Sequence, residues 1–113
     1  MKEYTDYPLG RYNTFGINAI AKRFILLETE DDIRRVAKME THRGFILGGG
    51  SNVVLPDRYE GDVIHPENRG IRLLQESEGQ YLVEAAAGEK WAEFVDICIA
   101  EGWHGVENLA GIP

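Results

Sequence analysis

Cysteine is almost absent from this sequence of 113 residues, in which Cys98 is the single example. One cysteine cannot form an intramolecular disulfide, and it cannot supply the several thiolates of a structural zinc site. A lone thiol is compatible with a reducing compartment, so we expect a cytoplasmic protein. Cys98 lies on the apolar stripe of an expected helix, and we interpret it as a small buried hydrophobic residue rather than a nucleophile.

Long apolar runs and an excess of positive charge are also missing. No stretch approaches the ~20 apolar residues of a membrane-spanning helix, and residues 1–10 contain no apolar signal core. The formal net charge is −7, which makes nucleic acid and anionic lipid surfaces poor partners. We therefore expect a protein that binds neither nucleic acid nor membrane. A nucleotide ligand is compatible with this charge, because backbone N–H groups hold phosphate without cationic side chains.

Clusters that could hold a metal ion or carry acid–base catalysis are not found in the sequence. His42, His65 and His104 are scattered, and none has a second ligand at a metal-binding spacing. We interpret them as loop or strand-end residues and predict no metal site. Acidic pairs such as Asp31 with Asp32 are most simply charges at a helix start, so no carboxylate pair is nominated for catalysis.

Glycine, by contrast, is abundant, with 13 residues that punctuate short apolar segments. The pattern predicts strands near 24–27, 45–47 and 63–65, a hairpin of 71–76 with 80–85, and helices from Thr29 to near Gly44 and from about Lys90 to Glu101. This order predicts an α+β fold, in which a small parallel βαβ element precedes antiparallel strands and a helix. We expect residues 1–18 to form a mostly irregular N-terminal arm, and residues 19–113 to form the domain.

The strongest local feature is the run from Leu47 to Asn52, LGGGSN, directly after an expected strand. Successive N–H groups of such a loop can enclose a pyrophosphate, but the loop could also simply turn the chain. Gly50 stands where the lysine of a P-loop is required. A Rossmann fingerprint is excluded as well, because Val53–Pro56 is a poor helix start. A phosphate site here would therefore belong to neither of these two classes of phosphate-binding loop.

Three segments of the sequence together resemble the UDP-N-acetylenolpyruvoylglucosamine reductase family. They are Asn13–Ile17 (NTFGI), Leu47–Leu55 (LGGGSNVVL), and Ala87–Trp91 (AGEKW) followed by Gly105–Pro113 (GVENLAGIP). Their order and separations match the family over essentially the whole chain. Many flavin oxidases share a Gly-rich Ser-Asn loop, whereas the first and last segments make the resemblance specific.

The resemblance implies an FAD-binding domain of the vanillyl-alcohol-oxidase and p-cresol methylhydroxylase type. It also implies the chemistry of peptidoglycan synthesis, in which NADPH reduces FAD and the flavin then reduces UDP-N-acetylglucosamine enolpyruvate to UDP-N-acetylmuramate. Asn13–Ile17 are expected to support the loop structurally, and direct contact with the substrate is the alternative. The resemblance assigns two groups to FAD: Gly48, Gly49, Gly50, Ser51, Asn52 and Val53 at the pyrophosphate, and Asn108, Gly111, Ile112 and Pro113 beside the flavin ring.

The family's catalytic arginine, serine and glutamate lie beyond the position that matches Pro113, as does the substrate domain. We therefore expect a truncated chain that contains no catalytic residue and is inactive by itself. Two alternatives stay open. One is a stand-alone nucleotide-binding module without catalysis, and the other is a different flavin oxidoreductase of the same fold, such as an alcohol or amine oxidase. A covalent flavin link would favour the latter, although no histidine neighbours the triple-glycine loop.

Overall fold

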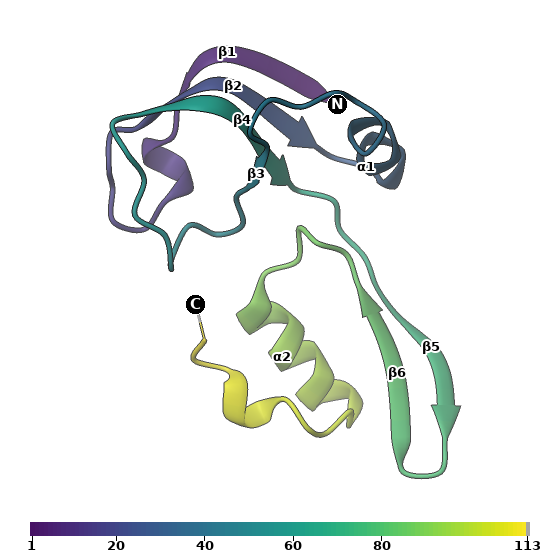
Figure 1. Ribbon diagram of the computed structural model, residues 1–113. Coiled ribbons are helices and arrows are strands. Elements are labelled where there is room, and N and C mark those ends of the chain that lie inside the picture. The colour runs from purple at the N-terminus through teal and green to yellow at the C-terminus, as the bar shows by residue number, and fades with distance from the viewer. Residues whose placement is uncertain (113) are drawn as a thin grey trace. The chain divides into compact units, whose positions relative to one another are not determined.

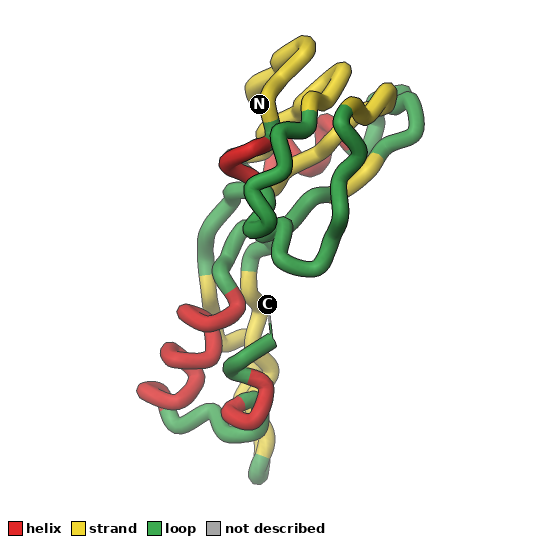
Figure 2. The backbone as a smooth tube through the Cα atoms, turned by 90° about the vertical axis from the view of Figure 1, so that its left-hand side faces the viewer, coloured by secondary structure: helices red, strands yellow, loops and turns green. Residues whose placement is uncertain are grey.

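The computed structural model describes residues 1–112 and contains two compact units, Met1–Asn68 and Arg69–Pro113. Strands and helices follow one another along the chain and are joined by loops, as Figure 2 shows. Among residues 1–112, no helix is long and apolar enough to cross a membrane.

The first unit is built on a four-stranded sheet with the strand order β1-β2-β4-β3 (Figure 1). β1 (Lys2–Pro8) pairs antiparallel with β2 (Ile20–Leu27). β4 (Arg58–Pro66) pairs parallel with β2 on one side and with β3 (Phe45–Ile46) on the other. The sheet is therefore mixed, as expected of an α+β fold. The predicted parallel βαβ element is present, but β4 lies between its two strands.

β1 corrects the expectation of a mostly irregular arm over residues 1–18, which is wrong for residues 2–8. The segment KEYTDYP is polar, and six of its seven residues are exposed. A strand at the edge of a sheet needs no continuous apolar face and tolerates a proline, so its sequence carries little strand signal. The division into an arm of residues 1–18 and a domain of residues 19–113 stays a prediction.

Helix α1 (Glu30–Val36) begins directly after its N-cap Thr29, where the sequence predicts the start of a helix. Thr29 Oγ1 accepts a hydrogen bond from the Asp32 N–H at 3.1 Å, and Asp32 Oδ2 accepts one from the Thr29 N–H at 3.0 Å. This reciprocal capping box satisfies two amides at the helix start. The helix ends well before the predicted end near Gly44. Beyond the helix, the backbone hydrogen bonds connect residues three apart: the Lys38 N–H donates to Arg35 O, and the Met39 N–H donates to Val36 O. Such bonds tighten the last turn and end the helix.

Asp32 makes the stability of the first unit depend on acid pH. Its buried carboxylate also accepts a hydrogen bond from the N-terminal ammonium of Met1 at 2.8 Å and from the Glu28 N–H at 2.9 Å. The ammonium first, and then the backbone bonds, hold the pKa of Asp32 well below its usual range. A depressed pKa in the folded state stabilises the fold above the unfolded pKa of about 3.9, and this contribution is lost as the pH falls further.

We therefore expect Asp32→Asn to lower the thermal midpoint at pH 7 and to flatten its decline between about pH 5 and pH 2. Circular dichroism melts across this pH range make the measurement. Asp31→Asn is the matched control, because the Asp31 carboxylate is exposed and pairs with Arg34 on the same helix. An Asp32→Asn chain whose midpoint follows that of the unsubstituted chain at every pH would contradict this role.

The hydrophobic core of the first unit brackets the Gly-rich run. Leu47 is 1% exposed and Leu55 is 7% exposed, so buried leucines anchor the loop on both sides. Removing such side chains from water supplies the main driving force that holds the loop ends in place. The buried apolar cluster consists of Leu9, Ala19, Ala21, Phe24, Leu26, Leu47, Leu55 and Val63.

The second unit contains the predicted hairpin and the predicted helix. β5 (Ile71–Ser77) pairs antiparallel with β6 (Gln80–Ala85), and α2 (Trp91–Glu101) follows. Gly102 ends α2 with a positive φ of 75°, and the Trp103 N–H donates to Cys98 O, which is the expected glycine stop. Cys98 is buried, as predicted. A short 3-10 helix, η2 (Glu107–Leu109), comes last.

Candidate functional site

The Gly-rich run forms a loop at the carboxyl end of β3, at the edge where ligands commonly bind to parallel strands. It begins directly after Leu47, whose N–H donates to Ile64 O in β4 at 2.9 Å. Gly48, Gly49 and Asn52 are exposed, Ser51 and Val53 are half-buried, and Gly50 is buried. Three of the six predicted pyrophosphate residues are therefore exposed on the first unit, and one is buried.

Two carbonyl groups of the run, those of Leu47 and Gly50, accept hydrogen bonds from other parts of the first unit. Leu47 O lies 2.8 Å from His65 Nδ1, and Nδ1 must carry a proton there because a carbonyl oxygen only accepts. Gly50 O accepts a hydrogen bond from the Thr14 N–H at 3.1 Å. Within residues 1–112, no N–H from Gly48 to Asn52 donates to another group of the chain. The carbonyl oxygens of Leu47 and Gly50 thus accept hydrogen bonds from the rest of the first unit. The N–H groups from Gly48 to Asn52 have no hydrogen-bond partner within residues 1–112.

The three consecutive glycines meet different surroundings. Gly50 has a positive φ of 72°, and a Cβ on it would lie 2.1 Å from Tyr12 O and 2.6 Å from Asn13 Cα. Apart from the glycine itself and its two neighbours in the chain, no residue has a heavy atom within 4 Å of a Cβ built on Gly48 or Gly49. Gly50 is therefore required by the fold itself, whereas the space beside Gly48 and Gly49 is open.

Asn13 organises the segment that contacts the loop. Its buried side chain donates to Leu9 O at 2.9 Å and to Ile17 O at 3.0 Å, and its Oδ1 accepts from the Ile17 N–H at 2.8 Å. These bonds fold residues 9–17 into a compact turn that places Thr14 against Gly50 O. The geometry agrees with the prediction that Asn13–Ile17 support the loop.

The other predicted FAD residues lie in the second unit. Asn108 is exposed within η2, and Gly111 and Ile112 are exposed after it. The Ile112 N–H donates to Leu109 O, which also accepts from Trp91 Nε1 at 2.6 Å. Pro113 lies outside the described residues. The role of these residues beside a flavin ring stays a prediction.

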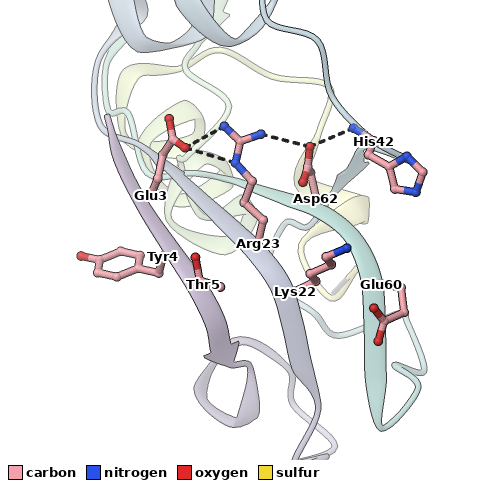
Figure 3. Close-up of a pocket in the computed structure, with 8 residues that line it drawn as sticks. All are labelled: Glu3, Tyr4, Thr5, Lys22, Arg23, His42, Glu60 and Asp62. Atoms are coloured by element: carbon pink, nitrogen blue, oxygen red, sulfur yellow. Dashed lines mark hydrogen bonds and ion pairs between the residues drawn. The ribbon is translucent and has the colours of Figure 1, made fainter.

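A second polar feature of the first unit is a cavity of about 290 Å³ crossed by an ion-pair network (Figure 3). Arg23 Nη2 lies 2.7 Å from Glu3 Oε2, and Arg23 Nη1 lies 3.4 Å from Asp62 Oδ2. The buried Asp62 also accepts from the His42 N–H at 2.9 Å. This network connects β1, β2 and β4, so it serves strand pairing. Among residues 1–112, no group of three or more His, Cys, Asp or Glu could hold a metal ion.

Comparison with known proteins points to one kind of enzyme, although no family model matches the chain. The UDP-N-acetylenolpyruvoylglucosamine reductase of Neisseria meningitidis serogroup A is 48% identical over 105 residues, which cover 90% of this chain and 30% of that protein. The protein of the same name from Azoarcus sp. is 42% identical over 116 residues, covering 96% and 33%. That from Bacteroides fragilis is 37% identical over 113 residues, covering 95% and 33%. The chain thus spans about a third of the length of these relatives.

A solved structure shows the same fold. The UDP-N-acetylenolpyruvylglucosamine reductase from Thermus caldophilus matches with a TM-score of 0.67 over 99% of this chain and 38% of that chain. At 23% sequence identity, this likeness establishes the α+β architecture with its mixed sheet. Taken with the sequence identities, it shows that the chain is homologous to the N-terminal part of UDP-N-acetylenolpyruvoylglucosamine reductases.

Proposed function

We propose that this chain forms the N-terminal FAD-binding part of a cytoplasmic reductase that acts in peptidoglycan synthesis. The parent enzyme would reduce UDP-N-acetylglucosamine enolpyruvate to UDP-N-acetylmuramate with NADPH. The observation that supports this most directly is the loop from Gly48 to Asn52, which exposes Gly48, Gly49 and Asn52 and whose N–H groups have no partner within residues 1–112. The homology to reductases that bear the name of this substrate gives the independent support.

The loop fits the diphosphate bridge of FAD. Consecutive N–H groups form a concave site for anions, and the missing side chains of Gly48 and Gly49 leave open space next to the backbone. Ser51 and Asn52 can add side-chain donors. With a net charge of −7, the protein would attract the diphosphate through these local dipoles rather than through its overall charge.

FAD, when bound, would supply the hydride transfer between NADPH and the enolpyruvyl double bond. The residues of this chain would bind and orient the cofactor: the loop from Gly48 to Val53 at the diphosphate, and Asn108, Gly111, Ile112 and Pro113 beside the flavin ring. No residue of this chain is proposed to be catalytic.

The chain by itself is expected to show no reductase activity and at most weak FAD binding, because it corresponds to about a third of its relatives. Titration of the 113-residue chain with FAD, followed by flavin fluorescence, measures this. Sub-micromolar binding by the chain alone would show that the cofactor site is wrongly assigned.

The proposed function is tested by a chimera in which this chain replaces the matching N-terminal part of the Neisseria meningitidis reductase. We expect the chimera to purify with bound FAD and to oxidise NADPH when the enolpyruvyl substrate is added. Gly49→Val in the chimera is expected to lower FAD content by tenfold or more, roughly the effect of obstructing a close backbone contact worth a few kcal/mol. The control Gly49→Ala places a smaller group at the same point. A folded chimera that lacks FAD would contradict the proposal.

A further inference from the structure

We infer that His65 is a positioning residue for the diphosphate site, because it binds Leu47 O and thereby turns the N–H of Gly48 outward. The inference rests on the proposed function of the loop. His65 was expected from the sequence to be a strand-end histidine, and it does lie at the carboxyl end of β4. The structure adds a specific contact, 2.8 Å long, from its ring to the residue that precedes the glycines.

Peptide geometry connects this contact to the loop. In a trans peptide unit the C=O and the N–H point in opposite directions, and residues 1–112 contain no cis peptide bond. Leu47 C=O and Gly48 N–H belong to one such unit. A hydrogen bond that draws Leu47 O toward His65 therefore directs the Gly48 N–H away from β4. The Leu47 N–H is bound to Ile64 O, so the residue is fixed on both sides.

The ring of His65 is itself held in place. Its side chain is 13% exposed. The ring centroid lies 5.0 Å from that of Tyr12 and 5.9 Å from that of Phe24. A packed ring keeps one orientation, so Nδ1 can act as a fixed donor. The ring therefore acts on the ligand through the peptide of Leu47 and Gly48.

We call the hydrogen bond from His65 to Leu47 O a clamp on the loop. A second clamp, at Gly50 O, orients another N–H group by the same peptide geometry. Gly50 O accepts from the Thr14 N–H at 3.1 Å, which directs the Ser51 N–H away from Thr14. The two clamps come from different segments, one from β4 and one from the turn around Asn13. They orient the first and fourth N–H groups of the run from Gly48 to Asn52. The clamp at Gly50 O consists of a backbone N–H and a longer contact of 3.5 Å from Thr14 Oγ1, whereas the clamp at Leu47 O consists of the His65 side chain alone.

The test compares His65→Asn with His65→Leu in the 113-residue chain. The two side chains have nearly the same shape, but Asn Nδ2 can donate from the position of His Nδ1. Pyrophosphate affinity is measured by ³¹P NMR titration at millimolar concentrations. We expect His65→Leu to weaken binding roughly fivefold or more, the loss that follows from removing one orienting hydrogen bond. His65→Asn is expected to bind within about twofold of the unsubstituted chain.

Nitrogen-15 NMR of the His65 ring gives a second measurement that needs no variant, and Nδ1 is expected to carry a proton. An unprotonated Nδ1, or equal affinities of the Leu and unsubstituted chains, would overturn the inference while leaving the proposed loop site intact. If the unsubstituted chain binds no pyrophosphate, the loop site fails and the inference fails with it. Thermal melts of both variants establish that any loss of affinity occurs in folded protein.

Discussion

Gly50→Ala is expected to lower the free energy of unfolding of the first unit by about 3 kcal/mol or more, whereas Gly49→Ala changes it by less than about 1 kcal/mol. At Gly50 the new Cβ would lie 2.1 Å from Tyr12 O, on a backbone with a positive φ of 72°. The turn that contains Tyr12 and Asn13 would have to move away from the Gly-rich loop. At Gly49 the new methyl group meets no heavy atom within 4 Å beyond its own residue and the two adjacent ones.

Urea denaturation followed by circular dichroism measures the difference between these adjacent glycines. The comparison is sharp because the two substitutions are chemically identical and one residue apart. Equal effects on stability would mean that Gly50 is not packed against the turn that contains Asn13. A large effect of Gly49→Ala on stability would mean that its side of the loop is occupied by protein rather than open.

Asn13→Ala is expected to cost about 2–4 kcal/mol of folding free energy. The substitution leaves Leu9 O, Ile17 O and the Ile17 N–H without their side-chain partner, and Asn13 itself is only 7% exposed. Asn18→Ala is the matched control, because Asn18 is exposed and lies on the same segment. The same denaturation experiment applies. An equal loss of folding free energy in the two variants would contradict this role of Asn13.

The loss at Asn13 should extend to the loop. Because the Asn13 side chain shapes the turn that offers the Thr14 N–H to Gly50 O, hydrogen exchange is expected to accelerate at the Thr14 amide in Asn13→Ala. Acceleration that is confined to residues 9–12 and spares Thr14 would show that the turn and the loop are independent of each other.

The elements that the sequence predicts well are those specified by local patterns. The hairpin of β5 and β6 has a turn signal between two strands, and α2 has an apolar stripe closed by Gly102. Such signals depend on residues close together in the chain. β1 was missed because a polar edge strand has no such pattern. The place of β4 between β2 and β3 depends on pairing between distant segments, which local periodicity does not encode.

The candidate site, like the fold, can be predicted from the sequence only where local patterns specify it. The Gly-rich loop is visible in the sequence because three consecutive glycines are unusual. Its two clamps are not visible, because Thr14 contacts a residue 36 positions away and His65 contacts one 18 positions away. A histidine at the end of a strand is common, and its importance here follows from the neighbouring strand that brings it to Leu47.

The proposed function depends on the backbone amides from Gly48 to Asn52, which we propose hold a diphosphate. The most direct measurement is a ¹⁵N–¹H NMR titration of the chain with ADP and, separately, with AMP, which shares the adenosine but has one phosphate fewer. We expect ADP to shift the amide signals of Gly48, Gly49 and Ser51 most, and AMP to shift them less. Signals of these amides that stay unchanged at saturating ADP, or that respond equally to AMP, would contradict it.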